Sequence, residues 1–369
     1  MHLTTTRPKR HRAVFHGLTI SRVEQLTDQA IAISFALPPA LREEYTFEPG
    51  QHLTLRATIG GEDIRRSYSI CASRQRVRET GELRVATARV PEGVMSTWLH
   101  DNAEPGEELQ VMTPIGGFTC PTRPGTARHH VAIAAGSGIT PVMSLLTTAL
   151  EEEPESRATL VFGNRRTDTI MFLEELMDLK NRFPDRFQLF NVLSREAQEV
   201  ELFSGRLDRD RLEGFFERFI PVGDVDEWYL CGPLGMVETA RATLADCGVD
   251  REHVHYEVFH VEDTRPPAPP PPPDAAPLAT VTVTLDGRTT QVPVRSQSQS
   301  ILAATLRERP DAPFSCTNGV CGTCRARVVE GEVRMDRNYA LEDEEVEAGI
   351  VLTCQSHPVT DEVVLDYDA

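Results

Sequence analysis

The sequence predicts three domains in series: an all-β sandwich or barrel, a doubly wound α/β domain, and a small domain that opens on a β-hairpin. Residues 16–125 alternate short apolar runs with turn signals, and residues 126–262 alternate strand patterns with helix patterns. Residues 279–369 begin with alternating apolar positions around an Asp-Gly pair. A chain of 369 residues is long enough for two or three such domains.

The all-β region follows a basic tail at residues 1–15. Ala30–Ile33 and Leu83–Ala86 are examples of its apolar runs, and Gly60-Gly61 marks a tight turn. Evenly spaced short strands of this kind form a sandwich or a barrel. A frayed terminus is the simplest interpretation of the tail. Its basic residues are Arg7, Lys9, Arg10 and Arg12.

The second region predicts a parallel sheet. Its strand patterns are Val131–Ala134, Leu160–Phe162, Leu189–Leu193 and Trp228–Leu230, and helix patterns such as Phe172–Leu179 lie between them. Strands that alternate with helices favour a doubly wound sheet with helices on both faces.

A proline-rich linker, residues 263–278, separates this region from the last one. Proline excludes helix and ladder pairing, so we expect an extended spacer with few contacts crossing it. Two interpretations stay open: a passive tether, or an arm that lets the C-terminal domain move. After the linker, Val281–Leu285 runs into Asp286-Gly287, a strong hairpin signal.

The charge of the chain limits its partners. A net charge of −18 repels phosphate backbones and argues against nucleic acid as a main partner. The uncharged run 131–150 has the length of a membrane span, but Gly136, Gly138 and Pro141 interrupt it, which favours strand, turn and helix. We therefore expect a cytoplasmic protein without a membrane partner.

Four cysteines predict an iron–sulfur cluster. Cys316, Cys321 and Cys324 form a C-x4-C-x2-C loop, and Cys354 follows at a distance, which is the plant-type [2Fe–2S] spacing. Two irons need four thiolates, and glycines in the loop let three of them converge. A zinc site or unrelated buried cysteines are the alternatives, but structural zinc usually shows a second C-x2-C pair.

A glycine loop predicts a dinucleotide site. The strand Val131–Ala134 runs into Gly136-Ser137-Gly138-Ile139-Thr140-Pro141, where glycines and a helix start favour a pyrophosphate. The acidic residue that usually follows about 20 positions later is absent. Arg165 and the pair Ser194-Arg195 stand at the ends of the next two strands instead. A cation beside the ribose favours NADPH over NADH, although NADH and plain surface arginines remain alternatives.

Two further motifs follow strands. Cys231-Gly232-Pro233 comes after Trp228–Leu230, at a carboxyl edge where ligands bind. Cys231 would lie beside a nicotinamide there, and a buried apolar cysteine is the alternative. Arg66-Ser67-Tyr68-Ser69 ends a strand of the all-β region. An arginine can clamp a phosphate, a tyrosine can stack on a flavin, and a small hydroxyl can face the flavin N5.

The order of these motifs resembles the ferredoxin–NADP reductase superfamily, in members that carry a C-terminal plant-type ferredoxin. The resemblance covers nearly the whole chain after about residue 16. It implies an antiparallel β-barrel that binds FAD (16–125), a doubly wound α/β domain that binds NAD(P)H (126–262), and an α+β domain of the β-grasp type that binds the [2Fe–2S] cluster (279–369).

The resemblance also implies roles for residues. Tyr68, Ser69 and Cys231 would lie where hydride is transferred, and Phe259 would approach the flavin. The cluster ligands would be Cys316, Cys321, Cys324 and Cys354. The flavin residues would be Arg66, Tyr68, Ser69, Ser73, Gly93 and Ser96. The nucleotide residues would be Gly136, Gly138, Thr140, Pro141, Arg165, Ser194, Arg195, Cys231, Gly232 and Pro233.

Within the superfamily the chain most resembles the reductases of phenylacetyl-CoA epoxidases, on Ala134–Pro141, Val192–Glu196 and Asn338–Gln355. This implies electron transfer from NADPH through FAD and a [2Fe–2S] cluster to an oxygenase, expected to be the di-iron epoxidase of phenylacetate degradation. One alternative is the reductase of a steroid or aromatic-ring hydroxylase, such as 3-ketosteroid 9α-hydroxylase. The other is a redox sensor or carrier subunit without turnover.

Overall fold

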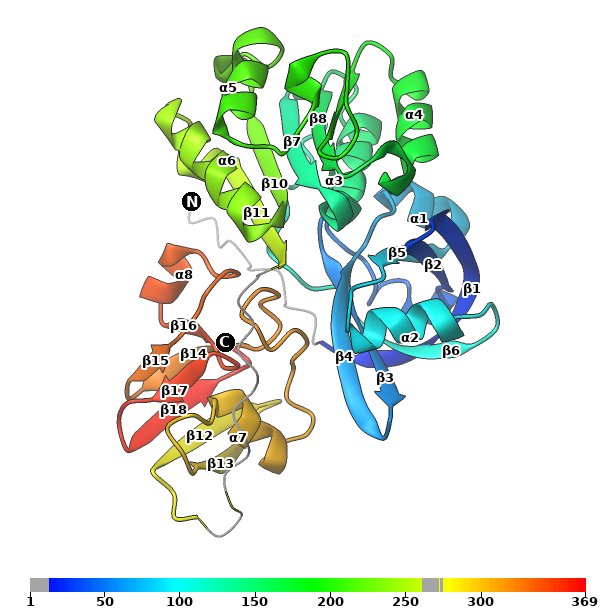
Figure 1. Cartoon of the computed structure of the whole chain (residues 1–369). Helices are drawn as coiled ribbons and strands as arrows, with labels where there is room; N and C mark the ends of the chain where they lie inside the picture. Colours follow the sequence, from blue (N-terminus) through cyan, green and yellow to red (C-terminus); the bar gives the residue numbers. More distant parts are fainter. Residues whose placement is uncertain (1–12, 261–271, 273–274) are drawn as a thin grey trace, which may run out of the picture.

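A computed structural model describes residues 13–260, 272 and 275–369, and these form three domains (Figure 1). The N-terminal domain is a six-stranded antiparallel sheet in the order β4-β3-β6-β1-β2-β5. A bridge between Ile70 and Val85 joins the end of β4 to β5 and closes the sheet into a barrel. Its strands are β1 (Phe15–Thr27), β2 (Ala30–Ala36), β3 (His52–Ile59), β4 (Glu62–Ser69), β5 (Glu82–Ala88) and β6 (Glu108–Met112), with helices α1 (Arg74–Thr80) and α2 (Val94–Asn102).

The barrel begins at Phe15, one residue before the expected boundary, and most of the basic tail lies outside the described residues. The turn between β3 and β4 is Gly60-Gly61, where both residues have positive φ (61° and 85°). A two-residue hairpin turn of this kind matches the twist of the strands it joins, which is why glycines stand there.

The middle domain is a parallel sheet in the order β11-β10-β7-β8-β9. Alternate residues of β7 point to opposite faces: Ala132 and Ala134 pack with α3 and α4, whereas Val131 and Ile133 pack with α5 and α6. The sheet is therefore doubly wound. Its elements are β7 (His129–Ala135), α3 (Ile139–Glu152), β8 (Arg157–Asn164), α4 (Leu173–Arg182), β9 (Phe187–Leu193), α5 (Arg209–Arg218), β10 (Glu227–Pro233), α6 (Leu234–Asp246) and β11 (Val254–His260).

The C-terminal domain is a mixed sheet in the order β13-β12-β18-β14-β16, in which β12 and β18 are parallel. Helix α7 covers it through Ile301, which packs on Val281 and Val292. The hairpin turn is Asp286-Gly287, both at positive φ, as the sequence predicts. Its elements are β12 (Ala279–Leu285), β13 (Arg288–Val294), α7 (Ile301–Glu308), β14 (Arg325–Glu330), β15 (Val333–Met335), α8 (Asp343–Glu347), β16 (Ile350–Leu352), β17 (Ser356–Pro358) and β18 (Glu362–Asp366).

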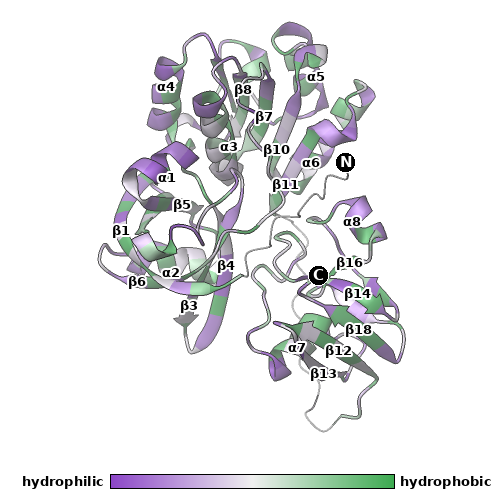
Figure 2. Cartoon of the chain, turned by 180° about the vertical axis from the view of Figure 1, so that it is seen from behind, coloured by the Kyte–Doolittle hydropathy of each residue, from purple (hydrophilic) through white to green (hydrophobic). Residues whose placement is uncertain are grey.

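Hydrophobic residues concentrate in the strands, and the outer helices α4 and α5 are largely hydrophilic on their exposed sides (Figure 2). Among the helices of the described residues, none is long and apolar enough to cross a membrane. The uncharged run 131–150 divides into β7, a glycine turn and α3.

The C-terminal domain is docked on the other two, so the expectation of few contacts across the linker is wrong for the described residues. Arg65, on β4, is 5% exposed and donates to the carbonyl oxygens of Pro310 (3.3 Å) and Ala312 (3.4 Å). Its guanidinium lies 4.3 Å from the centre of the Phe314 ring. Arg251 of the middle domain forms ion pairs with Glu342 and Asp343 at the start of α8. Most of the linker itself lies outside the described residues.

A buried carboxylate ties the end of α3 to the start of β7. Glu153 is fully buried and accepts hydrogen bonds from Arg128, from Ser156 Oγ (2.6 Å) and from His130 Nε2 (3.0 Å). Burial alone would raise the pKa of Glu153, but these partners outweigh it and hold the pKa well below its usual range. The carboxylate therefore stabilises the fold as an anion.

We expect Glu153→Gln to destabilise the protein by about 3 kcal/mol, because Arg128 then loses its closest counter-charge while buried. Since the pKa of Glu153 is lowered in the folded state, this stabilisation is present above about pH 4.5 and is lost as the pH falls further. Urea denaturation at pH 7 and at about pH 3 measures both effects. Glu155→Gln, the same change at an exposed neighbour, is the control, and equal losses in the two variants would contradict the prediction.

Candidate functional site

The predicted flavin motif lies on β4, paired with β3. Alternation along the strand puts Arg66 and Tyr68 on one side and buries Ser69, which pairs with His52. The guanidinium of Arg66 is exposed and donates to the Arg65 carbonyl oxygen (2.7 Å). Burial raises the pKa of Tyr68 well above its ordinary value, so this ring stays neutral. An arginine and a neutral aromatic ring on one side of a strand suit a flavin phosphate and a flavin ring.

Two serines assigned to the flavin shape the backbone with their hydroxyl groups. Ser73 Oγ accepts from the backbone N–H of Arg76 (3.2 Å) and starts α1. Ser96 Oγ accepts from Val90 N–H (3.1 Å) and donates to the Gly93 carbonyl oxygen (3.2 Å). A Cβ on Gly93 would lie 2.6 Å from Ser96 Oγ, so a glycine is needed for this turn. The turn leaves the N–H groups at the start of α2 available for an anion.

The glycine loop at the carboxyl end of β7 forms an open cradle. Gly136 has φ 53°, and no atom lies within 4 Å of the place its Cβ would take. A Cβ on Gly138 would lie 2.2 Å from the Cys231 carbonyl oxygen, so only glycine lets the loop approach β10. Thr140 Oγ1 donates to the Ser137 carbonyl oxygen (3.0 Å), and Pro141 lies in the first turn of α3, where no N–H is required. The open space and the helix start fit a pyrophosphate.

Two arginines stand free at the ends of neighbouring strands. Arg195 N–H donates to the Arg165 carbonyl oxygen (2.8 Å), and Ser194 Oγ donates to Asn164 (3.2 Å), so the ends of β8 and β9 are joined. Arg165 and Arg195 are exposed, and neither guanidinium has an ion-pair partner within the part of the chain that the structure describes. Uncompensated cations at this edge suit a phosphate group.

Two residues near Cys231, Glu257 and His52, have no role in the sequence motifs. Cys231, fully buried, pairs with Glu257 of β11, and burial raises the pKa of its thiol well above the ordinary value. Glu257 Oε1 lies 4.0 Å from His52 Nδ1. Burial raises the pKa of Glu257 to about 8 and lowers that of His52 to about 4. Phe259, two residues after Glu257 on β11, is half-buried against the shared core of barrel and middle domain.

This cluster fits a polar ring system. Glu257 Oε2 and His52 Nε2 are buried and have no hydrogen-bond partner among the described residues. Leaving such atoms unsatisfied costs about 1–3 kcal/mol each, and a bound flavin or nicotinamide offers the missing partners. Cys231 and Glu257 are neighbours because β10 and β11 pair in this register. The sequence reveals this contact only once the register of the two strands is known.

The four predicted cluster ligands gather in one loop region. Cys316 contacts Cys321, and Cys324 contacts Cys354. The loop turns at positive φ on Thr317, Gly319 and Gly322. Two pairs of thiols match two irons with two protein thiolates each.

Two hydrogen bonds involve the sulfurs of this loop. Asn318 N–H donates to Cys316 Sγ (3.4 Å), and Thr323 Oγ1 lies 3.2 Å from Cys321 Sγ. Hydrogen bonds to the thiolates tune the potential of an iron–sulfur cluster. The donor set and its surroundings therefore fit a [2Fe–2S] cluster.

The cluster loop touches the flavin strand. Ser315, the residue before Cys316, is hydrogen-bonded to Ser67 (Oγ–Oγ 2.9 Å), which stands between Arg66 and Tyr68. Val320 of the loop packs against the core of the middle domain. Figure 1 shows this loop region at the junction of all three domains.

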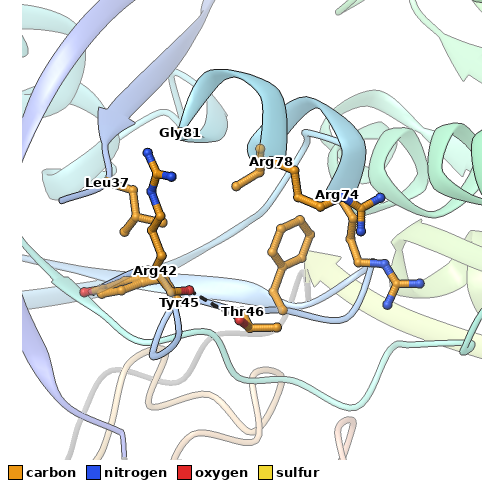
Figure 3. Close-up of a pocket in the computed structure, with 9 residues that line it drawn as sticks. Leu37, Arg42, Tyr45, Thr46, Arg74, Arg78 and Gly81 are labelled. Atoms are coloured by element: carbon orange, nitrogen blue, oxygen red, sulfur yellow. Dashed lines mark hydrogen bonds between the residues drawn. The ribbon is translucent and has the colours of Figure 1, made fainter. Parts of the chain in front are cut away.

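A separate cavity of about 280 Å³ lies under α1, the helix that Ser73 caps (Figure 3). Arg74 pairs with Glu48 (3.1 Å) and with Glu152, which also pairs with Arg78. None of the predicted site residues lines it. Because two of its three arginines are already paired, we assign it no ligand.

Comparison with known families agrees with the three domains. Residues 17–120 match the oxidoreductase FAD-binding domain, residues 132–242 the oxidoreductase NAD-binding domain, and residues 283–359 the 2Fe-2S iron-sulfur cluster binding domain. These segments hold the flavin motif, the glycine loop and the four cysteines, respectively.

The chain is similar over almost its full length to components of multicomponent oxygenases. It is 40% identical to a component of the 1,2-phenylacetyl-CoA epoxidase of Escherichia coli (strain K12), over 96% of this chain and 98% of that protein. It is 34% identical to the ferredoxin reductase component of the 3-ketosteroid-9-alpha-monooxygenase of Rhodococcus rhodochrous, over 95% and 96%. The fold matches phthalate dioxygenase reductase with a TM-score of 0.58 and 24% identity, over 95% of this chain and 98% of that one.

Proposed function

Because this chain belongs to the family of oxygenase reductases that join FAD-, NAD- and [2Fe–2S]-binding domains, we propose that it supplies electrons from NADPH to an epoxidase acting on phenylacetyl-CoA. When bound, FAD accepts a hydride and the cluster carries electrons singly. The observation that carries the electron path from flavin to cluster is the hydrogen bond between Ser67 and Ser315, which joins the flavin strand to the cluster loop.

The protein residues orient the cofactors in this proposal. Arg66 would pair with a flavin phosphate, and Tyr68 and Ser69 would hold the flavin ring. The backbone of the glycine loop would hold the nucleotide pyrophosphate, and the end of β10 at Cys231 would lie nearest the nicotinamide. Glu257, whose raised pKa leaves it partly protonated near neutral pH, can donate or accept a hydrogen bond there.

The partner we propose is the oxygenase part of an epoxidase, of the di-iron type. Full-length similarity to the epoxidase component supports this choice, and the similarity to steroid monooxygenase reductases supports the alternative. The test mixes the purified holoprotein and NADPH with the oxygenase component of each system and measures oxygenated product. Product with the phenylacetyl-CoA system is expected, and product only with the steroid system would contradict the proposal. Steady NADPH oxidation with an artificial acceptor separates both from a carrier without turnover.

We propose a cytoplasmic location, where NADPH and reduced thiols are available.

We expect Arg195→Ala to weaken the use of NADPH far more than that of NADH. Only NADPH carries a 2′-phosphate, and a charge-assisted bond to it is worth about 1.5–3 kcal/mol, or about 10–150-fold in affinity. KM values for both coenzymes measure the difference. The control is Arg218→Ala, an exposed arginine at the end of α5. Equal effects on the two coenzymes, or a preference of the parent protein for NADH, would contradict the assignment.

A further inference from the structure

A second cluster of reactive side chains lies at the amino edge of the parallel sheet, opposite the glycine loop. Cys120 stands in the segment between barrel and β7, Glu227 begins β10, and His255 is near the start of β11. Sγ of Cys120, a carboxylate oxygen of Glu227 and a ring nitrogen of His255 all lie within 4.8 Å of one another. Cys120 is 7% exposed, and the ring of His255 is 24% exposed. None of these residues takes part in the site described above.

Hydrogen-bond donors converge on the sulfur of Cys120. Arg128 Nη1 lies 3.4 Å from Sγ, and a ring nitrogen of His255 lies within 4.8 Å of it. Sγ also lies 4.0 Å from the carbonyl oxygen of Pro121. His255 Nε2 in turn lies 2.9 Å from Glu227 Oε2. The result is a cysteine, histidine and glutamate in series, with a guanidinium beside the sulfur. A neutral thiol is a weak acceptor, so a guanidinium and an imidazole around one sulfur favour the thiolate.

The electrostatics of the pair agree with this geometry. Burial alone would raise the pKa of Cys120, but its polar neighbours, His255 foremost and Arg128 among them, outweigh it, and the pKa is lowered. Burial alone would lower the pKa of His255, but its bonds to Cys120 and Glu227 raise it to about 9. Two other buried thiols behave in the opposite way: burial raises the pKa of Cys71 to about 12 and that of Cys231 well above its ordinary value.

The remaining charges around the pair are accounted for. The negative charge of Glu227 disfavours the thiolate. Arg128 forms an ion pair with Glu227 (3.3 Å) and so partly neutralises that charge. Beyond Arg128 lies Glu153, and His253 Nδ1 lies 3.9 Å from Glu227. His130 lies behind Tyr229, hydrogen-bonded to its hydroxyl group (3.0 Å).

A zinc ion is the competing interpretation of these three side chains. Sulfur, imidazole and carboxylate are all zinc ligands. However, the guanidinium of Arg128 lies within 3.4 Å of both the sulfur and the Glu227 carboxylate, so a cation already serves these two groups. A second cation would face it at short range, which favours the thiolate over the metal site.

We propose that Cys120 is held as a thiolate by His255 and Arg128 and is a site of oxidation by hydrogen peroxide. The sulfur attacks one peroxide oxygen, so an S–O bond forms as the O–O bond breaks. The sulfur loses two electrons, and the leaving hydroxide takes the proton of the His255 imidazolium. The products are a cysteine sulfenic acid, water and a neutral imidazole. Because Cys120 is only 7% exposed, we expect it to react with peroxide and not with bulky disulfides.

The test treats the full-length holoprotein with hydrogen peroxide at pH 7, traps sulfenic acid with dimedone, and follows each cysteine by peptide mass spectrometry. The exposed Cys247 is the internal reference. An ordinary cysteine is only a few per cent thiolate at this pH, so full ionisation raises the reactive fraction by up to about 30-fold. We expect Cys120 to be labelled faster than Cys247. Glutathione disulfide should react with Cys247 and not with Cys120.

Substitution of the histidine separates ionisation from packing. We expect His255→Gln to slow labelling of Cys120 about tenfold and to leave labelling of Cys247 unchanged. Glutamine cannot take up the thiol proton as the imidazole of His255 does, so less thiolate forms. Loosened packing alone would expose the sulfur and speed the reaction. Cys120→Ser should remove the label and leave NADPH oxidation with an artificial acceptor unchanged.

Three results would overturn the proposal. The first is labelling of Cys120 that is no faster than that of Cys247, and the second is an unchanged rate in His255→Gln. The third is a zinc ion bound at about one per chain that is lost in Cys120→Ser, which would assign the three side chains to a metal. None of these readouts depends on the identity of the oxygenase.

Discussion

Replacing Cys321 by alanine is expected to abolish electron delivery to the oxygenase while NADPH still reduces the flavin. Cys321 contacts Cys316, and this pair is placed to hold one of the two irons. With one thiolate removed, that iron keeps a single protein ligand, so the cluster is lost. The flavin strand contributes none of the four cysteines, so FAD binding is expected to persist.

Iron content, the visible spectrum and stopped-flow flavin reduction measure these effects. Iron should fall from about two per chain to near zero, whereas FAD content and flavin reduction should stay close to those of the parent protein. The control is Cys247→Ala, which changes an exposed cysteine of the middle domain and should keep its iron. Two irons per chain in Cys321→Ala would remove this residue from the ligand set.

Gly138→Ala is expected to lower the rate of flavin reduction by NADPH about 100-fold. The added Cβ would lie 2.2 Å from the carbonyl oxygen and 2.5 Å from the carbonyl carbon of Cys231. Both are backbone atoms, so the glycine loop and β10 must move apart. Displacement of a positioned group by about 1 Å costs on the order of 100-fold in rate.

The matched control is Gly235→Ala in α6, where the added Cβ meets no atom within 4 Å. Stopped-flow reduction compares the two variants, and FAD content and circular dichroism show that each is folded. A Gly138→Ala protein that reduces its flavin at the parental rate would mean that this close approach does not position the nucleotide.

Local features of the sequence predict much of this fold. The hairpin at Asp286-Gly287 depends on two adjacent residues at positive φ, and the cysteine loop depends on spacing within nine positions, from Cys316 to Cys324. The glycine loop is likewise a single strand–turn–helix segment. Each of these signals lies within one short stretch, so no tertiary information is needed to find it.

The features that escaped prediction join segments that are distant in the chain. Glu257 meets His52 only because β11 and β3 come together at the domain junction. The proline-rich linker suggested independent domains, but docking depends on Arg65, which in the sequence is only one more strand residue beside the flavin motif. Neither spacing nor composition reveals such a contact, since it depends on how two finished surfaces fit.

The contact between Ser67 and Ser315 also has a kinetic consequence. The flavin strand and the cluster loop belong to one polypeptide and touch, so their encounter is a first-order event. For two separate proteins the same encounter would be second-order, and its frequency would fall with dilution. Covalent linkage gives an effective concentration on the order of millimolar for short linkers. Exchange between the two centres is therefore insensitive to how much of the protein a cell makes, and only the meeting with the oxygenase depends on abundance.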